Sequence, residues 1–154
     1  MKSFLAALAA IALLATQGCA PTGSDCSVAS PDGRIHLTFA LNSEGCPSYA
    51  VTFDGDTVVR PSLMGFEVAD PADPDFHSGF SFAARPAMES VDSVWVPVWG
   101  ENDTIVNRYT ALNVRLTKKS SSGADRLLNI AFRVYDDGIA FRYIFPAQGS
   151  DSLV

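Results

Sequence analysis

Apolar and polar residues alternate with a period of two along most of the sequence, and this pattern restricts the possible folds more than any other feature. Between Arg34 and Leu41, every second side chain is apolar. In an extended strand such positions share one face. The segment is therefore predicted to be a strand with one buried face, whose apolar residues are Ile35, Leu37, Phe39 and Leu41.

The same alternation recurs in short runs separated by glycine, proline and aspartate. Asp54-Gly55-Asp56 and Asp136-Asp137-Gly138 have the composition of tight hairpin turns, and Gly138 can take a positive φ without strain. No segment after residue 20 has a convincing helical period. The expected fold is all-β, an antiparallel β-sandwich, with further strands at 49–53, 57–60, 63–68, 94–99, 112–116, 128–134 and 139–145.

The composition excludes two broad classes of protein. Hydrophobic residues make up 47% of the chain, which is too high a share for intrinsic disorder. The 11 Lys and Arg residues are outnumbered by 17 Asp and Glu, giving a net charge of −6. A nucleic-acid-binding domain normally carries a basic surface, so no nucleic-acid partner is expected.

The first twenty residues have the organisation of an export signal. One charge, Lys2, precedes twelve consecutive apolar residues from Phe4 to Ala15, and small residues follow. As a helix this run would rise about 18 Å, which is too short for a bilayer core of roughly 30 Å. We therefore expect residues 1–20 to be a signal peptide and the protein to be exported.

The end of the signal allows two interpretations. Residues 16–19, Thr-Gln-Gly-Cys, resemble a bacterial lipobox, in which Cys19 would be lipidated and become the new N-terminus. The Thr and Gln depart from the usual residues of that motif, and the alternative is ordinary cleavage after Ala20. Lipidation would make residues 21–29 a tether to the outer membrane, whereas ordinary cleavage would leave the protein in the periplasm.

Two further cysteines, Cys26 and Cys46, lie in the exported part. Export brings the chain into oxidising conditions, which permit a disulfide between them. Loop closure by this bond would contribute about 3 kcal/mol. The alternative is two thiols that never meet, because the sequence does not give the Cα separation on which a disulfide depends.

Candidate metal and catalytic residues are sparse. His36 and His77 are the two histidines, and neither has a Cys or carboxylate at metal-ligand spacing. Asp70, Asp73 and Asp75 could offer oxygen ligands to calcium, but Pro71 and Pro74 interrupt the regular loop that such a site needs. We interpret this segment as a solvated acidic turn, and we assign no metal, cofactor or catalytic residue within this chain.

Residues 94–101 contain both tryptophans of the chain. Alternation places Trp95, Pro97 and Trp99 on one face and three valines on the other. If the valines faced the core, the two indoles would be presented outward and could stack on sugar rings. The alternative, which we favour, is that the tryptophans are buried in the sandwich or against a second domain, because two exposed indoles would make a costly apolar patch.

Four motifs together resemble the N-terminal domain of glycoside hydrolase family 97. The most extensive runs from Phe132 to Tyr143 (FRVYDDGIAFRY). Upstream of it lie Ser-Pro-Asp-Gly at 30–33, Trp-Gly-Glu at 99–101 and Asn-Arg-Tyr at 107–109. The resemblance extends in order and spacing from about Val28 to Leu153.

The resemblance implies a specific biological context. Members of that family are exported bacterial exo-acting α-glucosidases or α-galactosidases, in which a galactose-mutarotase-like β-sandwich precedes a catalytic TIM barrel that binds calcium near its active site. Residues 30–154 would then be part of that N-terminal sandwich, an incomplete fragment without catalytic residues. Its partners would be its own downstream barrel and an oligosaccharide substrate.

A second hypothesis stands beside this one. The chain would be a self-contained carbohydrate-binding surface lipoprotein that uses the face of Trp95 and Trp99.

Overall fold

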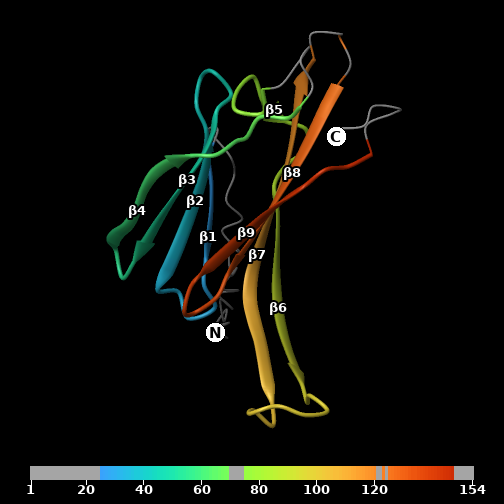
Figure 1. Ribbon diagram of the computed structural model, residues 1–154. Helices are drawn as coiled ribbons and strands as arrows, with labels where there is room; N and C mark the ends of the chain where they lie inside the picture. Colours follow the sequence, from blue (N-terminus) through green and yellow to red (C-terminus); the bar gives the residue numbers. More distant parts are fainter. Residues whose placement is uncertain (1–24, 70–74, 121–122, 124, 148–154) are drawn as a thin grey trace, which may run out of the picture.

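The computed structural model describes residues 25–69, 75–120, 123 and 125–147, which form two antiparallel β-sheets packed face to face (Figure 1). The first sheet contains β1 (Asp25–Ala29), β2 (Ile35–Leu41), β3 (Pro47–Phe53) and β4 (Asp56–Leu63), in that spatial order. The second contains β5 (Ser81–Phe82), β6 (Ala87–Trp95), β7 (Ile105–Lys119), β8 (Asp125–Val134) and β9 (Ile139–Ile144). Its order is β5-β7-β8-β9, and β6 also pairs with β7. The predicted all-β antiparallel sandwich is confirmed.

The inner faces of the two sheets carry the apolar residues that the alternation predicted. Phe39 of β2 packs against Phe132 of β8 with ring centroids 5.9 Å apart. Because every second residue of each strand points toward the opposite sheet, the core forms between the sheets. The fully buried apolar side chains include Leu37, Phe39, Phe76, Leu112, Val114, Leu116, Leu128, Ile130, Phe132 and Val134.

Several predicted elements have different boundaries in the structure. β4 continues through Pro61 to Leu63, and β7 extends beyond 112–116 at both ends. Asp25–Ala29, within the expected tether 21–29, forms β1. The strand expected at 63–68 does not form, because β4 ends at Leu63 and the chain then folds over the core, where Phe66 stacks on Phe76. The strand expected at 94–99 ends at Trp95, two residues before Pro97, which has no N–H to donate to a ladder.

The two predicted hairpin turns are both present. Asp54 and Gly55 have φ values of 50° and 89°, the left-handed pair that a two-residue hairpin turn requires. In the β8–β9 turn, the amide of Tyr135 donates to the carbonyl of Gly138 over 2.8 Å. Gly138 adopts no positive φ there, so this hairpin does not use the conformational freedom expected of that glycine.

β6 and β7 form a long hairpin, residues 87–113, which we call the arm. Its strands pair from Ala87 opposite Asn113 to Trp95 opposite Ile105. The far end of the arm extends beyond the first sheet (Figure 1). Side chains near that end are exposed on the inward-facing side as well, as Val94 and Val106 illustrate.

One side of the sandwich is open. β4 ends the first sheet and β9 ends the second, and within the described residues neither has a second neighbouring strand. Between them lies a groove of about 560 Å³, lined on its apolar walls by Ile35, Val51, Phe53, Val58, Val59 and Ile139. The inner faces therefore reach solvent along this side.

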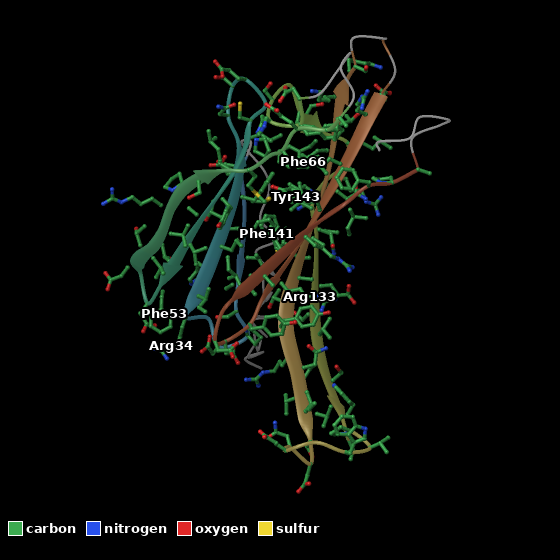
Figure 2. The ribbon with its side chains drawn as sticks, in the orientation of Figure 1. Arg34, Phe53, Phe66, Arg133, Phe141 and Tyr143 are labelled. Carbon is green, nitrogen blue, oxygen red and sulfur yellow. The ribbon has the colours of Figure 1, made fainter. Side chains whose placement is uncertain are left out.

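A row of aromatic rings continues the core along this open side. Phe141 and Tyr143 on β9 lie in this row (Figure 2), with their ring centroids 5.8 Å apart. Phe141 contacts Tyr49 of β3, and Tyr143 contacts Phe66. The Tyr143 hydroxyl accepts a hydrogen bond from the Gly65 amide, and burial raises the pKa of this phenol. The row anchors the segment after β4 to the second sheet.

Candidate functional site

The Ser-Pro-Asp-Gly motif at 30–33 forms the tight turn between β1 and β2. The Ser30 hydroxyl donates to the Asp32 carboxylate over 2.6 Å, and the Arg34 amide donates to the same carboxylate oxygen over 3.1 Å. The Ser30 oxygen also accepts from the Ile35 amide. These contacts satisfy the polar groups of the turn. The hydrogen bond from the Ser30 hydroxyl and, to a smaller extent, that from the Arg34 amide lower the pKa of the Asp32 carboxyl from its usual value.

Asp136, in the turn between β8 and β9, joins this motif to the second sheet. One of its carboxylate oxygens accepts from the Asp32 amide over 2.8 Å. The other accepts from the Arg108 guanidinium over 2.7 Å, and this hydrogen bond raises the pKa of Arg108. Three of the four motifs that carry the family resemblance therefore meet at one carboxylate, which we call the Asp136 junction.

The same region holds a second contact between motif residues. Tyr109 is buried, its ring lies 5.1 Å from that of Tyr135, and the Arg133 guanidinium sits 4.7 Å above it. Arg133 and Tyr109 come from neighbouring strands, so this contact is a cross-strand pair on the outer side of the second sheet. Hydrogen bonding and packing within the fold thus account for these motif residues.

The fourth motif lies elsewhere, at the far end of the arm. Trp95 is 53% exposed and Trp99 is 88% exposed. The sandwich therefore does not bury them, because the arm carries them past the first sheet. The other part of the favoured expectation, burial against a second domain, stays a prediction. The alternating face of valines is equally exposed, since Val98 is 100% accessible. The structure presents both indoles to solvent.

Cys26 and Cys46 form no disulfide in the structure. Cys26 lies on β1 opposite Phe39, whereas Cys46 precedes β3 and its carbonyl accepts from the Asn42 amide. β2 separates the two strands, so two interstrand spacings of roughly 4.8 Å already exceed the Cα separation of a disulfide. The register therefore favours the second alternative, two thiols that do not meet. Cys19, the candidate lipidation site, lies outside the described residues.

Asp75 is engaged within the fold. The His77 amide and the Ser78 hydroxyl donate to its carboxylate over 2.6 and 2.7 Å. The buried ammonium of Lys118 donates to its carbonyl and lies over the rings of Phe76 and Phe80. Burial raises the pKa of Asp75, but these hydrogen bonds and the Lys118 charge together bring it below 3.8. Asp70 and Asp73 lie outside the described residues.

A search of the described part of the chain for three or more His, Cys, Asp or Glu side chains able to hold a metal finds no such group. Among the same residues, none belongs to a helix long and apolar enough to cross a bilayer. His36 is exposed on β2, and His77 lies in the loop before β5.

The family described as Glycosyl-hydrolase 97 N-terminal matches residues 28–154. This chain belongs to that family. The curated Retaining alpha-galactosidase of Bacteroides thetaiotaomicron is 25% identical over 118 residues, which cover 77% of this chain and 16% of the relative. The resemblance inferred from the motifs is confirmed.

Solved structures agree with the sequence comparison. A glycoside hydrolase family 97 enzyme from Pseudoalteromonas sp. strain K8, in complex with acarbose, superposes with a TM-score of 0.72 at 29% identity. A β-arabinopyranosidase superposes with a TM-score of 0.67 at 26% identity. The matches cover 81% and 80% of this chain but 18% of each of those chains. The chain therefore spans less than a fifth of the length of these relatives, as an N-terminal domain of family 97.

The Asp136 junction was not foreseen from the sequence. Asp32 and Asp136 are 104 residues apart, and nothing in their local patterns indicates a shared hydrogen bond. The one available signal was that each residue belongs to a family motif, Asp32 to the motif at 30–33 and Asp136 to the motif at 132–143.

Replacing Asp136 tests the junction. The Asp136→Ala variant should lose about 1 kcal/mol of unfolding free energy, because the Asp32 amide and Arg108 lose their shared acceptor at a partly exposed site. Urea denaturation of the chain without its signal measures this. Asp137→Ala, the exposed neighbour in the same turn, is the control and should stay close to wild type. Equal loss in both variants would contradict a specific role of Asp136.

Asp32 should give the fold a component of acid sensitivity. Because its pKa is lower in the folded chain than in the unfolded chain, its stabilising effect is complete above pH about 4 and is lost as the pH falls through the folded value. The difference in stability between Asp32→Asn and wild type should therefore be larger at pH 6 and decrease as the pH falls below about 4. Urea midpoints across that range measure this, and a constant difference would refute it.

Proposed function

We propose that this chain is the non-catalytic N-terminal sandwich of an exported α-glycosidase, an α-glucosidase or α-galactosidase, and that it supports a downstream catalytic TIM barrel. The observation that carries the proposal is the family match over residues 28–154 combined with the small share of each relative that the chain spans. The relatives' names include a retaining α-galactosidase and an enzyme bound to acarbose, which supports a glycosidase as the parent.

The chemistry of the described carboxyl groups supports a non-catalytic role. A glycosidase needs a carboxylic acid whose pKa is raised so that it can protonate the leaving group. Asp32, Asp54 and Asp75 have shifted pKa values, and all three are shifted downward by hydrogen bonds or ion pairs. Asp54, for example, pairs with Arg34 over 2.6 Å at one end of the first sheet. Such groups remain ionised and cannot act as general acids near neutral pH.

We also propose that the parent enzyme is exported and is either periplasmic or attached to the outer membrane. The apolar segment from Phe4 to Ala15 would direct export, and lipidation of Cys19 would attach the protein to the outer membrane. Calcium would be bound by carboxylates of the parent that lie outside this chain.

Assays of the separate and complete polypeptides test this function. The 154-residue chain alone should hydrolyse neither aryl α-glucosides nor aryl α-galactosides, whereas the polypeptide continued through the rest of its reading frame should hydrolyse at least one of them. The reason is that the acid and the nucleophile or base belong to the barrel. Release of the aryl group measures both reactions, and clear turnover by the chain alone would overturn the non-catalytic assignment.

Direct carbohydrate contact is a second candidate function, favoured by the exposure of Trp95 and Trp99. A pair of aromatic rings contributes roughly 0.5–1.5 kcal/mol beyond its buried area, and we expect an indole stacked on a sugar ring to contribute a similar amount. The Trp99→Ala variant should therefore weaken binding about two- to tenfold if the arm contacts glycans.

Titration calorimetry with maltotetraose and with a galacto-oligosaccharide measures that binding. Val98→Ala changes an equally exposed neighbour and serves as the control. Identical affinities for wild type and Trp99→Ala would remove the tryptophans from glycan recognition.

A further inference from the structure

The outer face of the second sheet, which points away from the core, has an alanine floor. Outward positions of neighbouring strands fall in rows, such as Ala87, Asn113, Ala131 and Arg142 on β6, β7, β8 and β9. The small side chains leave two hollows on this face, of about 330 and 180 Å³. A flat strand surface carries hollows only where its outward side chains are small.

Arginines surround these hollows. Arg115, Arg133 and Arg142 project from the adjacent strands β7, β8 and β9, and Arg85 lines the larger hollow. The lining of the two hollows contains no acidic side chain and no lysine. The lining of the hollows is therefore cationic on a chain whose net charge is −6. Other outward positions of the same sheet carry Glu89 on β6 and the Lys119–Asp125 ion pair.

Two of these arginines are available to a partner. Within the described part of the chain, neither Arg115 nor Arg142 forms an ion pair, and both are exposed. Arg133 is held by its contact with Tyr109, and Figure 2 shows it on the second sheet. Asn113 and Asn129 lie between the arginines and add amide donors and acceptors.

The chemistry of this face favours an acidic protein surface. A guanidinium presents a planar pair of donors that matches a carboxylate, and the alanine floor allows a partner's side chains to approach the strands. Protein interfaces are enriched in arginine and depleted in lysine, and the lining of the two hollows likewise contains arginine and no lysine. The relatives are more than five times as long as the matched segment, so a large neighbouring domain exists in them.

We propose that the outer face of the second sheet binds a carboxylate-bearing surface of the domain that follows in the parent polypeptide, with Arg115 and Arg142 as its main charged contacts. This inference rests on the proposed function, because it identifies the surface through which the sandwich supports the barrel. A tethered partner also acts at high effective concentration.

Charge reversal in the complete polypeptide tests the proposal. We expect Arg142→Glu and Arg115→Glu each to separate the unfolding of the sandwich from that of the barrel in differential scanning calorimetry, and to increase proteolysis between the domains about tenfold. The matched control is Arg60→Glu, which reverses an exposed arginine on β4 of the first sheet and should behave as wild type. Salt at 0.5 M should weaken domain coupling in wild type and have little effect in the reversed variants.

The outcomes separate this inference from the proposed function. Reversed variants indistinguishable from Arg60→Glu would overturn it. A change in the monomer–dimer equilibrium on light scattering, with domain coupling intact, would assign the face to a second copy and would also overturn it. Hydrolysis of aryl α-glycosides by wild type is measured separately, so its failure alongside arginine-dependent coupling would defeat only the glycosidase proposal.

Discussion

The mutual burial of two apolar sheet faces positions every other feature of this domain. Phe39 from the first sheet and Phe132 from the second lie in contact at its centre, and both are fully buried. Burying a side chain of this size contributes about 1.5–3 kcal/mol, and the strands on both sheets repeat such contacts. Because the inner positions are fixed by this packing, the outer positions of the same strands are fixed as well, including the arginines on β7, β8 and β9.

The ends of the sandwich are secured by polar contacts. At one end, Asp136 joins the β1–β2 turn to Arg108 of the second sheet. At the other, Lys118 is buried against Phe76 and Phe80 and holds the loop around Asp75. Neither set of residues performs chemistry on a substrate in the function proposed. Their role is to connect two sheets that the chain itself links only through loops.

Much of the fold could be read from local patterns, and the exceptions have physical causes. The strand around Phe39 and the hairpin at Asp54-Gly55 were predictable because alternation and turn residues are short-range signals. The segment around Phe66 looked like a strand because it is apolar, but its apolar residues face the core from a loop. The sequence left open whether Trp95 and Trp99 are exposed, because alternation gives the two faces of a strand but not whether an opposing sheet reaches that far.

The sequence by itself determined the all-β class, the positions of most strands and, through its motifs, membership of glycoside hydrolase family 97. These properties depend on local periodicity and on residue identity. Only the tertiary structure decided which residues meet across the sheets. It placed Asp32 beside Asp136, kept β2 between Cys26 and Cys46, and gathered Arg115, Arg133 and Arg142 on one face. Such contacts follow from strand order and register, which are set by packing between segments far apart in the chain.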